Sequence, residues 1–324
     1  MKTLKNIKFL KNNLSGRFTK QFKKENKTRI GLDWGFSSLK VVILEFENNN
    51  YILKDARIIP LPSRDLKLSS IIKDLDLSSG VTLGICGPNV IVRYVAMAKM
   101  NEDEFRNSLR YEAASNLPFP VEELNLDGVM LKDLPDNQML VMIAAAKKEF
   151  INQRLRLFQE EGIKVNILDI DSLALINVFN YTHPHIKEDD TLSGAVALLN
   201  IGASVTNINI LENGIPHFSR DINVGGKDFT QEASREVAIT NFVAEIRKSF
   251  DYYEAGTTAI INKMFLSGGG SLAPKLSSNL ENLLGIKVEQ WSPFSKFEFI
   301  PGLDEENIRK NSAQFAVAVG LALR

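Results

Sequence analysis

The sequence has few of the residues that build covalent or metal-held structure. Among 324 residues there is one cysteine, Cys86, and there are three histidines, His183, His185 and His217. A single cysteine excludes an internal disulfide and a zinc site of several cysteines, and so few histidines argue against a histidine-built metal centre. The histidines stand in polar or turn contexts, which indicate no Ser-His-Asp triad. Cys86 ends an apolar strand pattern, which predicts an inert, buried thiol.

Long apolar runs and an overall charge excess are also missing. No stretch approaches the ~18 consecutive apolar residues of a membrane-spanning helix. The 39 basic side chains equal the 39 acidic ones in number. An apolar share of 44% and a charged share of 24% are typical of a soluble globular protein, and the length favours two domains or one domain built from several subdomains.

The balanced total hides a basic arm over residues 1–28. This arm carries nine lysines and arginines and one acid, Glu25, so its net charge is +8 and that of the remaining chain is −8. An acidic body does not favour nucleic acid as a partner. In the arm, apolar residues recur at spacings near three or four or their multiples: Leu4, Ile7, Leu14, Phe18 and Phe22.

On a helix these residues would form an irregular apolar stripe flanked by lysines, as in helices that lie on an anionic membrane surface. A solvated, poorly ordered tail fits the same residues, and docking to a partner is a third interpretation. A secretory signal peptide does not fit, because the arm has neither a continuous apolar core nor a small-residue cleavage site. The role of the arm stays open at this point.

A strand pattern occurs twice in the rest of the chain. Residues 29–61 predict strand, turn, strand, turn and strand, and residues 195–224 repeat this order. Each copy is followed by segments with helical patterns. The repetition predicts an α/β protein of two similar halves that face one another. Helices are expected over residues 102–115, 147–161, 171–181, 226–254, 271–284 and 312–323.

Three glycine-containing turns follow buried strands and offer backbone N–H groups to phosphate. In the first turn Asp33 is a candidate to hold a hydrated Mg²⁺ ion, and the serines after it are candidates for a phosphate contact. The third, a strand followed by three glycines and a helix, would approach a nucleoside and direct a helix N-terminus toward phosphate. The candidate residues are Asp33, Gly35, Ser37, Ser38, Lys40, Asn200, Gly202, Ala203, Ser204, Gly268, Gly269 and Gly270.

The segments IGLDWGFSSLKVVIL, RYEAASNLPFPVEELNLD and MFLSGGGSLAPKL stand in an order that resembles the PilM family of type IV pilus assembly. These are actin-like ATPase relatives of the division protein FtsA, and the resemblance covers about residues 29–324. It implies an actin-like fold, with duplicated ribonuclease-H-like halves and an inserted subdomain called 1C. The implied parts are subdomain 1A (29–80, 166–185 and 305–324), subdomain 1C (81–165) and the second half (193–304).

The same resemblance implies a cytoplasmic protein, peripheral at the inner membrane, that docks the N-terminal peptide of PilN between subdomains 1A and 1C. It implies ATP and Mg²⁺ between the halves, and self-association is a further expectation. One alternative is an active, FtsA-like ATPase that polymerises at the membrane. Another is the actin-like part of a type II secretion GspL protein, although GspL carries a transmembrane helix that we do not expect here.

Two departures from the family bear on catalysis. Asn200 stands where the family usually has aspartate, and an amide lacks the charge that helps to hold hydrated Mg²⁺. The stretch from Gly226 to Glu254, about 29 residues, holds one long helix but hardly the small 2B subdomain usual there. Asp33 and Asp171 are the catalytic candidates, with Asp169 as a further acid, although Asp171 is also placed to cap a helix. We therefore expect a weak or degenerate ATPase at most.

Overall fold

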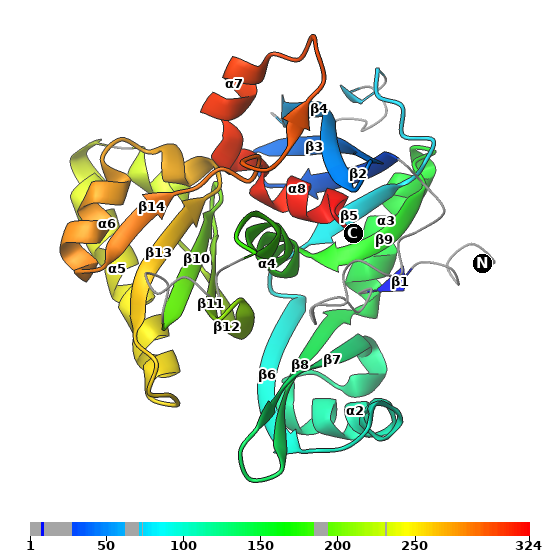
Figure 1. Cartoon of the computed structure of the whole chain (residues 1–324), viewed down its shortest axis with the longest axis vertical. Coiled ribbons are helices and arrows are strands. Elements are labelled where there is room, and N and C mark those ends of the chain that lie inside the picture. Colours follow the sequence, from blue (N-terminus) through cyan, green and yellow to red (C-terminus); the bar gives the residue numbers. More distant parts are fainter. Residues whose placement is uncertain (1–7, 10–27, 62–70, 73, 185–193, 231) are drawn as a thin grey trace.

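The computed structural model describes residues 8–9, 28–61, 71–72, 74–184, 194–230 and 232–324. Within these residues two sheets stand on either side of α4 (Asp171–Thr182) and α8 (Ala316–Ala322), and a third sheet projects from the first half (Figure 1). Most of the basic arm lies outside the described residues. The two residues of its interior that are described, Lys8–Phe9, form strand β1 and not a helix.

The first sheet has seven strands in the order β1-β9-β5-β2-β3-β4-β15. Strands β2, β3 and β4 form the predicted antiparallel meander, and β5 and β9 continue the sheet in parallel from β2. The strands are β2 (Thr28–Trp34), β3 (Ser38–Glu47), β4 (Asn50–Pro60), β5 (Val81–Ile85), β9 (Val165–Ile170) and β15 (Glu298–Phe299).

The second sheet repeats this topology. Its order is β12-β11-β10-β13-β14, with an antiparallel meander followed by two parallel strands. The predicted duplication is therefore confirmed. The strands are β10 (Ala195–Ile201), β11 (Thr206–Glu212), β12 (Ile215–Ile222), β13 (Ile261–Ser267) and β14 (Lys287–Gln290).

The third sheet has the order β6-β8-β7 and carries α2 (Glu102–Asn116) on one face. Its strands are β6 (Val90–Ala98), β7 (Leu124–Leu134) and β8 (Gln138–Lys147), with a short 3-10 helix, η2 (Val121–Glu123), before β7. The predicted cap of α2 is present, because the Asn101 side chain accepts from the N–H of Glu104.

The resemblance draws the inserted subdomain over residues 81–165, whereas β5 lies in the first sheet. The helix after β8, α3 (Lys148–Glu160), buries Ile151, Leu155 and Phe158 in the core of the first half. We therefore propose to draw the inserted subdomain around its own sheet, over residues 90–147.

In the second half the predicted long helix is α5 (Glu232–Glu254), which packs Ile239, Phe242 and Ile246 against the sheet. The two predicted C-terminal helices are each divided: residues 271–284 by a left-handed turn at Lys275, and residues 312–323 by a change of helix type. The remaining elements are η4 (Gly226–Phe229), η5 (Gly269–Leu272), α6 (Leu276–Leu284), α7 (Glu305–Lys310) and η6 (Ser312–Phe315).

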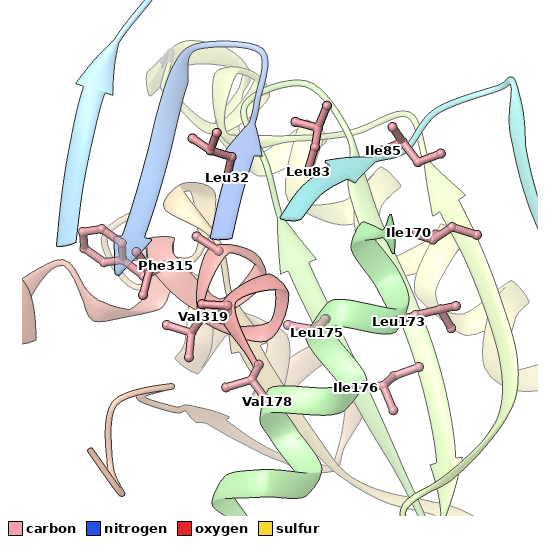
Figure 2. Packing of buried hydrophobic residues seen from close by; sticks show 14 of the residues in the cluster. Leu32, Leu83, Ile85, Ile170, Leu173, Leu175, Ile176, Val178, Phe315 and Val319 are labelled. Atoms are coloured by element: carbon pink, nitrogen blue, oxygen red, sulfur yellow. The ribbon is translucent and has the colours of Figure 1, made fainter. Parts of the chain in front are cut away.

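Close backbone contacts fix α4 and α8 under the strand ends. Figure 2 shows Leu32 of β2, Leu175 of α4 and Val319 of α8 in the core between the first sheet and these two helices. A Cβ atom on Gly320 would lie 1.9 Å from the carbonyl oxygen of Ala174, and one on Gly31 would lie 2.0 Å from that of Ala318. Only glycine fits at such distances, so these two positions set how closely the helices approach each other and β2.

Candidate functional site

A cavity of about 570 Å³ opens between the two halves and is also bordered by β6 of the inserted sheet. It collects strand ends and turns that are distant in sequence. Ten of the twelve predicted binding residues line it: Asp33, Gly35, Ser37, Lys40, Asn200, Gly202, Ala203, Ser204, Gly268 and Gly269. Ser38 and Gly270 are not among the lining residues.

The first turn holds a charged pair at the cavity wall. Asp33 and Lys40 are opposite one another in the ladder of β2 and β3, and Lys40 Nζ lies 3.2 Å from Asp33 Oδ2. Gly35 leaves room for this ammonium, since a Cβ atom there would lie 2.8 Å from it. The Gly35 N–H donates to the carbonyl of Ser38, which is itself buried at the start of β3. The turn thus presents a partly neutralised carboxylate and an ammonium group with further donors.

The second turn presents backbone donors instead of charge. The Gly202 N–H donates to the Val205 carbonyl at 2.9 Å and so closes the turn. Among the described residues, nothing accepts from the N–H groups of Ala203 and Ser204. Exposed consecutive N–H groups of this kind bind anions such as phosphate.

A glycine pair braces this second turn from behind. The Gly226 N–H donates to the Gly202 carbonyl at 2.8 Å, and a Cβ atom on Gly225 would lie 2.6 Å from the nitrogen of Ser204. The sequence analysis did not assign this pair to the site. Two adjacent glycines directly after a strand were the signal that could have found it.

The third turn adds glycine backbone to the same wall. Gly268 has a φ of +82°, and a Cβ atom on it would lie 2.7 Å from Asn200 Oδ1. Gly270 instead packs beneath the wall, where its Cβ atom would lie 2.4 Å from Cγ2 of Ile201. The three glycines therefore have different roles, which spacing alone does not separate.

Asp171 points into the cavity and does not cap its helix. It is the first residue of α4, where no side chain caps the N-terminus. Its Oδ1 is buried and has no hydrogen-bond partner among the described residues. Burial, and next the Asp33 carboxylate, raise the pKa of Asp171 to about 7. The capping interpretation is wrong, and Asp171 instead lines the cavity beside the Cys86 thiol, with one of its two oxygens unpaired among the described residues.

The other candidate acid, Asp169, has a structural role. It is fully buried and pairs with the guanidinium of Arg324. It is also absent from the cavity lining. A buried carboxylate of this kind is costly to separate from its guanidinium partner, so it has no charge to spare for a ligand.

Two cavity groups were missed or misjudged from the sequence. Cys86 is exposed and lines the cavity, so the expected buried thiol is wrong. Its surface faces a crowded, acidic space, and the Asp171 carboxylate raises the pKa of the thiol well above its usual range. Asp221 of β12 also lines the cavity and accepts from Asn207 Nδ2 at 2.9 Å.

Several basic side chains line the cavity or lie at its first turn. Arg154 of α3 lies over the Trp34 ring at 5.2 Å, and Lys227 Nζ lies 3.6 Å from the centre of the Phe36 ring in the first turn. Lys40, Arg93, Arg154 and Arg220 line the cavity. Among the described residues no group of three His, Cys, Asp or Glu could hold a metal ion. The basic side chains of the lining are suited to a polyanionic ligand.

Two polar contacts join the inserted sheet to the second half. The Tyr94 hydroxyl of β6 lies 2.9 Å from Ser219 Oγ of β12, and Lys132 Nζ of β7 lies 3.1 Å from Glu212 Oε2 of β11. Burial raises the pKa of Tyr94, so this hydroxyl stays protonated. The inserted sheet is thereby linked to the half that carries the second and third turns.

The profile of the type IV pilus assembly protein PilM family matches residues 31–249 and 238–324. The chain belongs to this family. The solved PilM-PilN type IV pilus biogenesis complex is 27% identical with a TM-score of 0.78, and the likeness covers 91% of this chain and 98% of that chain. The fold is actin-like, as the duplicated sheets and the resemblance indicate.

Two more distant solved structures are also similar. One is a Bacteroides thetaiotaomicron protein with an actin-like ATPase fold, at 14% identity, a TM-score of 0.48 and coverage of 84% and 93% of the two chains. The other is the ethanolamine utilization protein EutJ from Carboxydothermus hydrogenoformans, at 11% identity, a TM-score of 0.47 and coverage of 93% and 90%.

The two stretches of the PilM family match overlap at residues 238–249, inside α5. This is the segment where we expect a reduced 2B subdomain, which stays a prediction.

Among the described residues no helix is both long and apolar enough to cross a membrane.

Proposed function

We propose that this chain is a scaffold of the type IV pilus assembly platform and docks the N-terminal peptide of a PilN-like inner-membrane protein. The observation that carries the proposal is the likeness to a PilM-PilN complex over 98% of that chain. The docking groove would lie between the first half and the inserted sheet. Binding there would hold the protein at the cytoplasmic side of the inner membrane.

We further propose that the cavity binds ATP. The free N–H groups of the second turn and the cations around the cavity support this assignment, because both stabilise phosphate oxygens. Asp33 would hold a hydrated Mg²⁺ ion, which would supply charge neutralisation on the phosphates. This donor set fits Mg²⁺, which keeps several waters and needs only one or two carboxylates beside phosphate.

Regulation by nucleotide, without efficient turnover, agrees best with the side chains of the site. The second turn offers the Asn200 amide, and Asp171 titrates near neutral pH, so neither provides a permanent charge. A nucleotide held by both halves would select one cleft angle. Because Tyr94 and Lys132 tie the inserted sheet to the second half, that angle would also set the orientation of the inserted sheet.

The docking proposal is tested by melting the full chain with and without the N-terminal peptide of the PilN-like protein. At 100 times Kd a ligand adds about 2.7 kcal/mol to stability. A rise of several degrees in Tm is expected, with none for a scrambled peptide. An unchanged Tm at saturating peptide would overturn the proposal.

Phosphate release from Mg-ATP separates this function from that of an active, polymerising FtsA-like ATPase. We expect slow release. Brisk release that Asp33→Ala abolishes would favour the ATPase, and docking of a type II secretion peptide in place of the PilN-like one would favour a GspL-like role. An added contact of the basic arm with anionic lipid, worth about 1 kcal/mol per lysine or arginine, is tested by vesicle sedimentation before and after removal of residues 1–28.

A further inference from the structure

The outer edge of β9 is occupied by this chain's own N-terminal arm. Strand β1 pairs with β9 in parallel, with Lys8 opposite Ile167 and Phe9 opposite Leu168 (Figure 1). Apart from this pairing, β9 is hydrogen-bonded on one side only, to β5. An edge strand presents a row of backbone donors and acceptors to which an extended segment can add.

This edge belongs to the side of the first half that faces the inserted sheet. Asp169 of β9 pairs with Arg324, and the charge of Arg324 in turn acts on Asp127 of β7. The helix α3 connects β8 of the inserted sheet directly to β9. The β9 edge therefore lies beside the groove in which we propose that the partner peptide docks.

Charge complementarity favours the arm as the occupant of this edge. The arm has a net charge of +8 and the rest of the chain −8. Asp127 is an acid of β7 in the inserted sheet, near Arg106 and Arg324, and although burial raises its pKa to about 6 it is largely ionised at neutral pH. A basic, extended segment is thus attracted to this side of the molecule.

The tether between arm and sheet is long enough for such an exchange. Eighteen residues separate Phe9 from Thr28, and a chain of that length reaches up to about 60 Å. Three strand spacings, from β2 to β1, are about 14 Å. A tether of this length holds its end at an effective concentration on the order of millimolar. The weak pairing of β1 with β9 is therefore populated, yet a partner peptide can still displace β1.

We propose that the β9 edge is a strand-docking site and that this chain's arm fills it in cis through Lys8–Phe9, in competition with an extended partner peptide. The occupation of the edge stands on the strand pairing alone. The competition rests on the proposed function.

The test uses two full-length variants that differ in their backbone N–H groups. Lys8→Pro with Phe9→Pro removes both donors of β1, whereas Lys8→Ala with Phe9→Ala keeps them. Successive N–H groups of a strand point to opposite sides, so hydrogen exchange is followed at the amides of β9 that point toward β1, with those that point toward β5 as the internal reference. We expect exchange about tenfold faster in the proline variant than in the wild type, and within about threefold of the wild type in the alanine variant. Equal exchange in the proline variant and the wild type would overturn the proposal.

Two peptide experiments test separately whether the arm occupies the β9 edge and whether it competes with the partner peptide. A synthetic peptide of residues 1–20, added to the proline variant, should restore protection of β9, and a scrambled peptide should not. The PilN-like peptide should bind the proline variant about three to ten times more tightly than the alanine variant, because the competitor is gone. Equal affinities would remove the competition.

Absence of PilN-like peptide binding to either variant, with β9 protection still dependent on the arm, would overturn the proposed function but not the docking of the arm. If the proline variant lost binding to anionic phosphatidylserine vesicles while β9 protection was unchanged, the arm would serve the membrane and the inference would be wrong.

Discussion

The two halves share a backbone but differ in the charge that they present to the cleft. Asp33 and Lys40 are opposite one another across β2 and β3, and the corresponding positions across β10 and β11 hold Asn200 and Asn207. An ion pair in one half is thus a pair of neutral amides in the other. Strand order and turn geometry depend on buried residues and glycines, whereas side chains facing the cavity can change without disturbing either. The duplicated frame is thus retained, whereas this pair of opposite positions carries charge in the first half and neutral amides in the second.

Disrupting the close packing of α4 against α8 should have the largest effect on stability. Gly320→Ala places a methyl group 1.9 Å from the Ala174 carbonyl oxygen, and we expect a loss of about 3 kcal/mol or more in the free energy of unfolding. Urea unfolding followed by circular dichroism measures it. Gly256→Ala, with its nearest contact at 3.7 Å, is the matched control. Equal unfolding midpoints for the two variants would contradict the packing described for α4 and α8.

Asp171, the acid at the start of α4 that lines the cavity, should make the stability of the fold depend on pH. The pKa of Asp171 is raised to about 7, so the folded chain holds this proton more tightly than the unfolded chain does. The resulting stabilisation is complete below about pH 4 and is lost as the pH rises toward 7. Between pH 5 and 7.5 the wild type should lose about 2 kcal/mol relative to Asp171→Asn. Parallel stability curves of the two proteins would show that this carboxyl group titrates normally.

Replacing the acid of the first turn by an amide, as in the second turn, should weaken nucleotide binding. Asp33→Asn removes the partner of Lys40 and the proposed Mg²⁺ ligand, and we expect the affinity for Mg-ATP to fall about tenfold. Fluorescent nucleotide titration measures it. Asp55→Asn removes an acid that pairs with Arg57 on β4, at 2.8 Å and outside the cavity lining, and should leave the affinity unchanged. Equal losses in both variants would argue against a specific role for Asp33.

Replacing the amide of the second turn by a carboxylate, as in the first turn, should have the smallest effect, a modest rise in phosphate release. Asn200→Asp places a carboxylate at the start of the second turn, opposite Asn207. We expect phosphate release to rise about two- to fivefold, since one added group does not rebuild a catalytic site. A malachite green assay at saturating Mg-ATP measures it. Release that stays at the wild-type level would mean that the amide is not what limits turnover.

Local patterns predicted the parts of the fold that local chemistry determines. Alternating apolar residues and turn glycines located both meanders, and the order of the turns brought ten of twelve site residues to the cavity. Contacts between residues that are far apart in the sequence could not be predicted from such local patterns. Asp221 enters the cavity only because β12 packs beside β6, and β5 was assigned to the inserted part because its partners β2 and β9 are far away in the chain. Asp171 resembles a cap in sequence, yet its helix begins with it.

Docking without turnover is tested most directly by titrating the full chain with the N-terminal peptide of the PilN-like protein in the presence of Mg-ATP. Calorimetry would give the affinity, and phosphate release would be followed in the same sample. We expect saturable binding of one peptide per chain with a Kd of about 1–100 μM, and slow phosphate release that the peptide does not accelerate. No heat of binding at millimolar peptide, or release that rises steeply with the peptide, would contradict a docking scaffold.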